Sequence, residues 1–519
     1  MTIVGLGGLM GDAACAVLRE DKLVAAVEQK KIARRHEPGH LPAEAIHAAL
    51  RLARVEPEHV EAVALALPLG PGQATALHLA VRSQFPKGRL VLVDHHQAHA
   101  ASAFYASPFE DAAVLTLDRA GDFRCGALWR GAGVHLDLER ELYFPDSLGD
   151  LYGRVTELLG FRAGAEEHKV QWLSASGEPS FPVFDEILGA PEWPRIERSF
   201  LDASRMSRGG FSARFYQALG LPDETPVPAE LRASVAASLQ RAVENAVARM
   251  AGDAPRLCLA GGLAFNALLV AAMERKASVF VQPAAGNSGL ALGAAYHAWH
   301  HTFGGPRLAP LGDLFLGPGF SAPEIKQVLE NCKLRFHYLA TGDELVDTAV
   351  RVLGENKIIA WMQGRMEFGP RALGNRSILA SPRDPYSLEN LNAYIKHREP
   401  FRKFAASVPA ECANEYFAAG PNARFLATVG TVRPAWRETF ASAILSGDKI
   451  RVHTVEQAEN PLFHRLLHVA GKATGLPVLY NTSFNLFSDP LVCTPRDAVR
   501  SFYSSGIDAL FAGNFYLEK

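Results

Sequence analysis

Short apolar runs alternate with helical stretches along most of this chain, and that alternation constrains the fold more than any other feature. Three apolar runs, Thr2–Gly7, Ala13–Leu18 and Lys22–Val27, are separated by glycine and by charged residues, which predicts a β-meander. The stretch Ala43–Arg54 has apolar residues at helical spacing, and Val60–Leu67 then reads as a strand. We therefore expect an α/β fold.

The same alternation returns in a second block further along the chain. Asp111–Asp118 reads as a strand that ends on an acid, and Leu231–Met250 predicts a long helix before the strand Arg256–Ala260. Two such blocks indicate two α/β lobes around a cleft. A further helix over Asp343–Gly354 and a strand over Lys357–Met362 indicate another α/β domain, which runs to the end of the chain.

The chain has 519 residues, enough for two or three domains. Residues 302–339 are richer in proline and glycine than the sequence around them, which is typical of a connector. We therefore predict domains over residues 1–305 and 343–519, joined by a connector over residues 306–342.

Composition narrows the class of protein. The net charge of −2 argues against a general nucleic-acid or membrane surface, and the sequence has no apolar run long enough to span a bilayer. Its six cysteines form no C-x-x-C pair, so reduced thiols are expected in place of a zinc knuckle or a disulfide framework. We expect a cytoplasmic enzyme that binds neither nucleic acid nor membrane.

Two histidines are candidate metal ligands. His95 and His99 lie four residues apart, and the alanine-rich stretch Gln97–Tyr105 favours a helix, on which both side chains would share one face. Asp118 closes the next strand and could add a carboxylate. The alternative is a pair of capping or core histidines, and the spacing alone does not decide between them.

Two glycine-rich turns are candidate nucleotide contacts. In Leu259–Asn266, Gly261 and Gly262 stand between a predicted strand and a helix, where backbone amides can approach phosphate or ribose. Gly286–Ala295 repeats this arrangement. Ordinary βα turns remain the alternative for each. The chain contains no Walker sequence, so it is not a P-loop enzyme.

The stretch Trp361–Ala380 combines three arginines, Arg365, Arg371 and Arg376, with three glycines. Glycine lets the backbone approach a ligand, and the planar arginine fork matches an oxyanion, so the stretch predicts a phosphate or carboxylate cradle. A solvated basic face is the alternative. The apolar and proline residues interleaved with the later basic residues of Asn392–Phe404 favour the site.

The stretch Trp361–Ala380 also resembles, almost residue for residue, the signature of the O-carbamoyltransferases, which carbamoylate nodulation factors and antibiotics. Further blocks that match this family are Asn392–Phe404, Lys449–His453 and Leu479–Asn485, and the resemblance extends to the C-terminal residues Gly506–Lys519. It implies an actin/Hsp70-like (ASKHA) two-lobed N-terminal domain fused to a YrdC-like α/β C-terminal domain.

The resemblance also implies roles for individual residues. Those that would surround carbamoyl phosphate are Arg371, Lys396, Arg402, Arg451, Asn481 and Ser483. The implied metal ligands are His95, His99, Asp118 and Asn287, the last at a position where the family usually has aspartate. The implied contacts to ATP or adenylate are Lys169, Gly261, Gly262, Asn266 and Asn287. Asp12 and Asp118 would be catalytic, although Gly11 replaces the histidine that usually precedes Asp12.

The activity implied by the resemblance is ATP-dependent transfer of a carbamoyl group. Carbamoyl phosphate would yield carbamate, ATP would convert this to carbamoyl adenylate, and a small-molecule hydroxyl would accept the carbamoyl group. The implied cofactors are ATP and a divalent metal, Fe²⁺ or Mg²⁺, and a homodimer is a further expectation. The alternatives are an amine or tRNA-base acceptor, a non-catalytic family member and an ASKHA sugar kinase.

Overall fold

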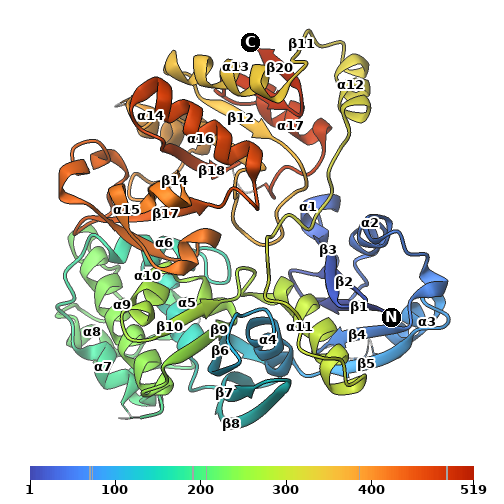
Figure 1. Ribbon diagram of the computed structural model, residues 1–519. Coiled ribbons are helices and arrows are strands. Elements are labelled where there is room, and N and C mark those ends of the chain that lie inside the picture. Colours follow the sequence, from blue (N-terminus) through green and yellow to red (C-terminus); the bar gives the residue numbers. More distant parts are fainter. Residues whose placement is uncertain (69–71, 73, 190–191, 206, 385, 487–488) are drawn as a thin grey trace. The chain divides into compact units, whose positions relative to one another are not determined.

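Figure 1 shows the computed structural model, coloured along the sequence. The chain forms two compact units. Unit 1 combines Met1–Val93 with Asn287–Lys519, and unit 2 is Asp94–Gly286. The structure describes residues 1–68, 72, 74–189, 192–205, 207–384, 386–486 and 489–519. The predicted domain limits differ from this division, because unit 1 joins the first part of the chain to the last.

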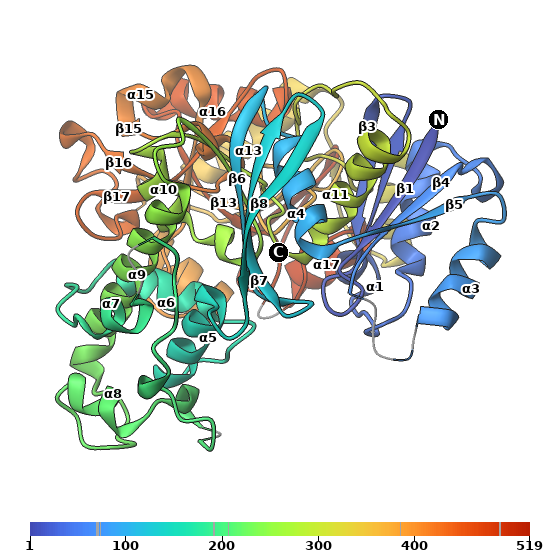
Figure 2. The ribbon, with the colours of Figure 1, turned by 90° about the horizontal axis from the view of Figure 1, so that it is seen from below.

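The first sheet of unit 1 has the strand order β3-β2-β1-β4-β5. Its strands are β1 (Thr2–Gly7), β2 (Ala14–Arg19), β3 (Lys22–Glu28), β4 (Ala62–Ala66) and β5 (Arg89–Val93). Strands β1, β2 and β3 pair antiparallel, which confirms the predicted meander. Strands β1, β4 and β5 are parallel and are seen side by side in Figure 2.

Helices cover this sheet. They are α1 (Gln29–Ala33), α2 (Ala43–Ala53), α3 (Ala74–Gln84) and α11 (Leu290–His297). Helix α11 packs on β1, β2 and β4, and it does so closely. A Cβ at Gly5 would lie 2.0 Å from the carbonyl oxygen of Ala291, and one at Gly7 would lie 2.5 Å from Leu290 Cβ. The two glycines of β1 are therefore required by helix packing.

The sheet of unit 2 repeats the arrangement of the first. Its order is β10-β9-β6-β7-β8, with β6 (Asp111–Gly121), β7 (Arg124–Ala132), β8 (His135–Tyr143), β9 (Arg256–Ala260) and β10 (Ser278–Val281). As in unit 1, three sequential strands, β6, β7 and β8, pair antiparallel. On its other side the first of them, β6, pairs parallel with β9, and β9 pairs parallel with β10. The two predicted α/β blocks are thus present.

The helices of unit 2 are α4 (His95–Phe104), α5 (Leu148–Leu158), α6 (Glu167–Ser174), α7 (Val183–Leu188), α8 (Ala213–Ala218), α9 (Ala229–Ala251) and α10 (Ala267–Glu274). Helices α5, α6 and α7 all contact α9, and the four pack together (Figure 2). In the sequence they lie between β8 and β9. Helix α4 packs against β6, β7 and β9 and carries the histidines of interest.

The C-terminal part of unit 1 contains a ten-stranded sheet of order β11-β20-β19-β12-β13-β18-β14-β17-β16-β15. The strands are β11 (His337–Tyr338), β12 (Ile359–Met362), β13 (Arg376–Ala380), β14 (Ala405–Pro409), β15 (Phe417–Ala418), β16 (Val429–Val432), β17 (Lys449–Val455), β18 (Leu479–Ser483), β19 (Ala509–Ala512) and β20 (Phe515–Glu518). Its helices are α12 (Ala322–Asn331), α13 (Gly342–Gly354), α14 (Ser387–Asn390), α15 (Ala413–Tyr416), α16 (Pro461–Thr474) and α17 (Pro495–Tyr503).

Both faces of this sheet are buried. Ile359 and Trp361 of β12 pack in a cluster with residues of α13 and α16, while Ala360 and Met362 pack in another cluster with residues of α12 and α17. Successive residues of a strand face opposite sides, so β12 reads as a continuous apolar run. The arginine-rich stretch begins at this central strand.

Shorter helical segments complete the fold. They are η1 (Pro57–His59), η2 (Arg198–Phe200), η3 (Arg208–Gly210), η4 (Gly262–Phe265), η5 (Asn287–Gly289), η6 (Ala298–Thr302), η7 (Leu391–Lys396), η8 (Ala410–Cys412), η9 (Pro421–Phe425), η10 (Pro434–Trp436) and η11 (Ala441–Ala443). The predicted connector contains α12 and the edge strand β11. Among the described residues, no helix combines the length and the apolar character that a membrane span requires.

Candidate functional site

Helix α4 places His95 and His99 on one face, as their spacing predicts. Asp94 caps the helix, because its carboxylate accepts hydrogen bonds from the backbone N–H groups of His96 (3.1 Å) and Gln97 (3.5 Å). Arg124 forms an ion pair with the same carboxylate. The first turn, which begins at His95, is therefore fixed by its neighbours.

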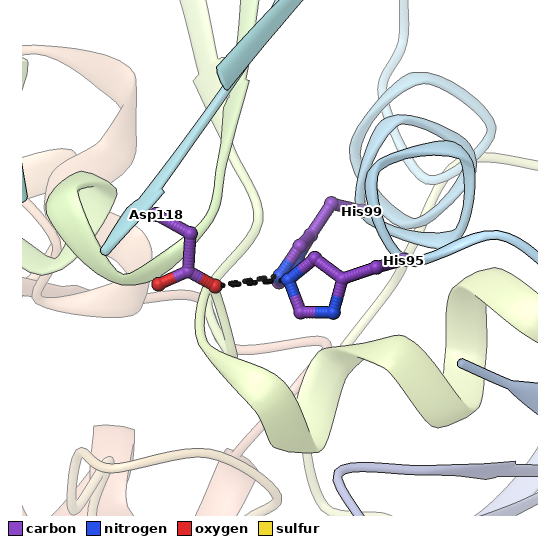
Figure 3. A group of neighbouring side chains, drawn as sticks. All are labelled: His95, His99 and Asp118. Carbon is purple, nitrogen blue, oxygen red and sulfur yellow. Dashed lines mark hydrogen bonds and ion pairs between the residues drawn. The ribbon is translucent and has the colours of Figure 1, made fainter. Parts of the chain in front are cut away.

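Both histidines point toward Asp118 (Figure 3). Asp118 Oδ2 lies 3.1 Å from His95 Nε2 and 3.3 Å from His99 Nε2. The three potential ligand atoms lie within 4.8 Å of one another. His95 and His99 are 3% and 0% exposed, so the group is closed to bulk water on the side of the helix.

The electrostatic state of this group suits a cation. Burial lowers the pKa of His99, and it lowers the pKa of the adjacent His96 to about 3, so these imidazoles are neutral at physiological pH. Burial alone would raise the pKa of Asp118, but hydrogen bonds from His95 and His99 hold it well below its ordinary value. A carboxylate that faces two imidazoles is a donor set that fits Fe²⁺ or another divalent transition metal.

Asn287 and Asp12, both in unit 1, are the remaining predicted members of this site. Asn287 lies in η5, and its side-chain oxygen is buried with no hydrogen-bond partner among the described residues. Asp12 is exposed and forms an ion pair of 2.8 Å with Lys30. The structure thus gives Asn287 a buried oxygen that suits a ligand, and it gives Asp12 a lysine partner; their roles stay predictions.

The Gly261-Gly262 turn packs on the strand that carries Asp118. Gly261 has a φ of +91°, and a Cβ there would lie 2.2 Å from the carbonyl oxygen of Leu117. Its N–H donates to the carbonyl of Ala285 (2.8 Å), so this amide is engaged within the protein. A Cβ at Gly262 would lie 3.0 Å from Asp118 Oδ1. Glycine at both positions keeps the turn beside the carboxylate.

Two other predicted nucleotide contacts have partners within unit 2. Asn266 caps α10 by accepting from the N–H of Leu269 (3.0 Å), and its amide donates to Gln240 (2.7 Å). Lys169 forms an ion pair of 2.9 Å with Glu166 and lies 5.3 Å from the centre of the Phe161 ring. Asn266 therefore positions α10, and contact of either residue with nucleotide stays a prediction.

Two of the three arginines in the signature stretch support the backbone. Arg376 is completely buried and donates to the carbonyls of Gln363 (2.5 Å), Asn375 (2.9 Å) and Pro318 (3.2 Å). Arg365 donates to the carbonyls of Leu316 (2.6 Å), Gly317 (3.0 Å) and Val24 (3.0 Å). The predicted cradle therefore uses these two arginines to shape the loop.

A buried glutamate and a lysine also hold the signature loop in place. Buried Glu367 accepts from the backbone N–H groups of Leu373 (2.8 Å), Asn375 (2.8 Å) and Arg376 (3.1 Å). Lys31 of α1 donates to the carbonyls of Glu367 and Gly369. These contacts fix the loop that carries the third arginine, Arg371.

A cluster of five buried or half-buried cations lies in the C-terminal part of unit 1. Its members, which we call the cation cluster, are Arg371, Lys396, Arg398, Arg402 and Arg451. Burial lowers the pKa of Arg371 to about 10, and repulsion from Arg402 adds to this effect. Burial followed by repulsion from Arg371 lowers the pKa of Arg451 well below its ordinary value. Concentrated positive charge of this kind calls for an anion.

Lys396 has partners within the protein, and its predicted contact with carbamoyl phosphate stays a prediction. Its ammonium donates to the carbonyls of Ser483 (2.5 Å) and Asn485 (2.8 Å) and to the Asn485 side-chain oxygen (2.8 Å). These contacts use all three N–H donors of the lysine. Ser483 donates to the same Asn485 oxygen (2.7 Å). Lys396 therefore positions the loop that carries Ser483.

Arg398 belongs to the cation cluster, although the sequence analysis did not single it out. Its Nε donates to Asn392 (2.7 Å), its guanidinium lies 4.1 Å from the centre of the Phe404 ring, and burial lowers its pKa to about 9. Its buried Nη2 has no partner among the described residues. The signal was present in the basic block Asn392–Phe404, where an arginine beside an aromatic ring can serve a ligand.

Polar groups of the sheet lie beside this charge. Arg451 and Asn481 both pair with Ala405, so their side chains share one face of the sheet. The amide of Asn481 donates to Ser407 (3.1 Å), which is hydrogen-bonded to His453 (2.9 Å), while the buried Asn481 oxygen has no partner within the described chain. Arg371, Arg402, Arg451 and Asn481 are thus brought into one region.

Comparison with known proteins identifies the family. The family model of the carbamoyltransferase C-terminus matches residues 350–519, and that of the N-terminus matches residues 73–296. Nodulation protein NolNO of Sinorhizobium fredii is 31% identical over 98% of this chain and 79% of its own length. Nodulation protein NolO of Bradyrhizobium diazoefficiens is 33% identical over 82% of this chain and 79% of its own length.

A third relative has an explicit acceptor in its name. The 3'-hydroxymethylcephem-O-carbamoyltransferase of Streptomyces clavuligerus is 33% identical over 43% of this chain and 40% of its own length. The protein is therefore an α/β enzyme that transfers a carbamoyl group. The chain belongs to the carbamoyltransferase family, as the signature stretch predicted.

Proposed function

We propose that this enzyme transfers the carbamoyl group of carbamoyl phosphate to a hydroxyl of a small molecule, with ATP and a carbamoyl adenylate intermediate. The observation that carries the proposal is the cation cluster beside Asn481 in the domain matched by the carbamoyltransferase C-terminus model. A small phosphate-bearing dianion would neutralise that charge, and several fixed N–H donors would orient it.

The first step is assigned to the cation cluster. Arg371, Arg402 and Arg451 would bind the phosphate, and the Asn481 amide would orient the carbamoyl group. Water then attacks, the bond between the carbamoyl carbon and the phosphate oxygen breaks, and carbamate and inorganic phosphate form. Positive charge held in place before the reaction stabilises the charge that develops on the leaving phosphate.

The second step is assigned to unit 2. Carbamate oxygen attacks the α-phosphate of ATP, giving carbamoyl adenylate and pyrophosphate. His95, His99 and Asp118 would hold a divalent metal, which supplies Lewis-acid stabilisation of phosphate oxygens when bound. The support is the donor set, in which two buried imidazoles face one carboxylate. The Gly261-Gly262 turn beside Asp118 is the proposed approach to the nucleotide.

The final step delivers the carbamoyl group to the acceptor. The acceptor hydroxyl attacks the carbonyl carbon of the adenylate, AMP leaves, and the hydroxyl proton passes to a base. Asp12 is the proposed base or orienting group, because it is an exposed carboxylate that could exchange its Lys30 partner for substrate. The name of the cephem relative supports a hydroxyl acceptor over an amine. The net charge of −2 favours a small molecule over tRNA.

The proposed fold family follows the same reasoning. The two sheets with matching strand order and direction support an ASKHA-type pair of lobes, and the ten-stranded mixed sheet is the proposed YrdC-like part. An ASKHA sugar kinase would release ADP, whereas the proposed reaction releases AMP.

The test is product analysis with purified protein. Incubation with carbamoyl phosphate, ATP and Fe²⁺ or Mg²⁺ should release phosphate, and pyrophosphate should form only when both substrates are present. A hydroxyl acceptor such as a hydroxymethylcephem is then added, and the product is examined for the mass increase of one carbamoyl group. Release of ADP, or pyrophosphate that forms without carbamoyl phosphate, would refute the proposal.

A further inference from the structure

A second group of metal-binding side chains lies in unit 1, outside the carbamoyl-transfer sites. His464 Nε2 and His468 Nε2 lie 2.9 Å and 2.7 Å from the same oxygen of Glu411. Ligand atoms of Glu411, Cys412 and His468 lie within 4.8 Å of one another. Three potential ligands thus converge, one carboxylate, one thiol and one imidazole, and the imidazole of His464 lies against the same carboxylate.

Two structural elements bring these side chains together. His464 and His468 lie one turn apart on α16, so both side chains emerge on the same face of the helix. Glu411 and Cys412 lie in η8, which directly follows strand β14. Because α16 packs against β14, the end of that strand carries its acid and thiol to the histidine face of the helix.

We propose that His468, Glu411 and Cys412 bind a zinc ion or a divalent metal of similar softness, with His464 positioning Glu411 through their hydrogen bond. Imidazole nitrogen, thiolate sulfur and one carboxylate form a ligand set that zinc takes in tetrahedral sites. Binding releases the thiol proton of Cys412 to solvent, and the metal–sulfur bond forms with the resulting thiolate. No electron transfer is involved.

The three ligand atoms lie within 4.8 Å of one another, which is close to the spacing that zinc requires. Ligand atoms about 2.0–2.3 Å from a tetrahedral metal lie roughly 3.3–3.8 Å from one another. The Glu411 oxygen is closer than this to both histidines, so its side chain would withdraw to admit the ion. Glu411 is 55% exposed on its side chain and is free to make that movement.

Metal can reach the site from solvent. The side chain of His468 is 37% exposed, whereas that of His464 is 9% exposed, so one imidazole anchors the site and the other faces outward. A surface cavity of about 560 Å³ adjoins it, lined by residues that include Gln457, His464, Arg465 and His468. The metal would therefore exchange without unfolding of the domain.

A plain ion pair is the competing explanation for the geometry around Glu411. An ion pair accounts for the two histidines and the carboxylate, but it gives Cys412 no role. A contribution of the Cys412 thiol to binding is therefore expected for a metal site and not for an ion pair. Sulfur also separates this site from the His95–His99–Asp118 group, which contains no cysteine.

The experiment is Co²⁺ titration of the full-length protein, followed by absorption spectroscopy, because thiolate bound to Co²⁺ gives a ligand-to-metal charge-transfer band. The wild-type protein should show this band and lose it on addition of Zn²⁺. Cys412→Ser should abolish the band, and His468→Gln should weaken Co²⁺ binding at least about tenfold. Both side chains are partly exposed, so both variants should fold.

The matched control is Cys332→Ser, which removes an exposed cysteine elsewhere in unit 1 and should leave the band unchanged. Zn²⁺ should also raise the thermal midpoint of wild-type protein more than that of Cys412→Ser, since a ligand that binds the native state stabilises it. Absence of the charge-transfer band in the wild-type protein, or an unchanged band in Cys412→Ser, would overturn the proposal.

Discussion

The cation cluster in unit 1 and the His95–His99–Asp118 group in unit 2 have opposite charge arrangements. The first concentrates positive charge, with the pKa of Arg371 lowered to about 10 by burial. In the second, burial lowers the pKa of His99, and hydrogen bonds from His95 and His99 hold the pKa of Asp118 low. Each group is unfavourable alone, since buried charge needs compensation. The difference assigns an anion to the first and a cation to the second.

The largest effect is expected from a substitution in the cation cluster, which should affect carbamoyl phosphate and leave ATP binding intact. Arg371→Ala should lower the rate of phosphate release from carbamoyl phosphate by at least about thirtyfold, since loss of a desolvated charged contact costs about 2–5 kcal/mol. ATP affinity, measured by calorimetry, should change little. Arg351→Ala, which removes an exposed arginine of α13, is the control and should leave both quantities unchanged. If Arg371→Ala reduced the rate of phosphate release and the ATP affinity equally, carbamoyl phosphate and ATP would not have separate sites.

The complementary change is made at the other group. His99→Ala should abolish pyrophosphate formation and weaken metal binding, while phosphate release from carbamoyl phosphate continues. The reason is that His99 is completely buried and directed at Asp118. His59→Ala, at an exposed histidine, serves as the control. Pyrophosphate formation at the wild-type rate in His99→Ala would show that His99 is not a metal ligand needed for this step.

A third change asks whether neighbouring arginines of one stretch differ in kind. Arg376→Ala should lower the free energy of unfolding by about 2–4 kcal/mol, because buried carbonyls lose their donors. Arg371→Ala should lower it far less, and relief of charge repulsion should offset part of the loss. Urea unfolding followed by circular dichroism measures both. Similar losses in the two variants would contradict the division into loop-shaping and ligand-binding arginines.

The smallest effect concerns Asn287, whose buried oxygen lacks a partner among the described residues. Asn287→Asp adds negative charge and should tighten binding of a divalent metal to the nucleotide-free protein about tenfold, roughly 1.4 kcal/mol. With ATP present the gain should shrink, because phosphates supply the same charge. Titration calorimetry with and without ATP tests this. An unchanged affinity would exclude Asn287 as a ligand.

Local patterns predicted much of the fold. The meander β1–β3, helix α4 and strand β12 follow from hydrophobic periodicity and from turn residues, which act over short distances. The union of residues 1–93 with 287–519 was not predictable in this way. It depends on contacts far apart in sequence, such as Lys31 with the carbonyl of Glu367.

The candidate site was predictable where residue type alone decides the chemistry. The pairing of His95 and His99 with Asp118 follows from spacing and from the end of a strand. The turning of Lys396 toward Ser483, and the use of Asn266 as a helix cap, depend on where loops come to lie. The spacing of His464 and His468 is the same signal that marked His95 and His99, but their convergence with Glu411 and Cys412 depends on the tertiary packing of η8 against α16 and could not be predicted.

The central claim is that phosphate release and pyrophosphate release occur at different groups. The most direct measurement follows both products in one reaction, with carbamoyl phosphate and ATP, for wild-type protein, Arg371→Ala and His99→Ala. We predict both products from the wild-type protein, neither from Arg371→Ala, and phosphate alone from His99→Ala. Loss of phosphate release in His99→Ala, or pyrophosphate from Arg371→Ala at the wild-type rate, would contradict the account.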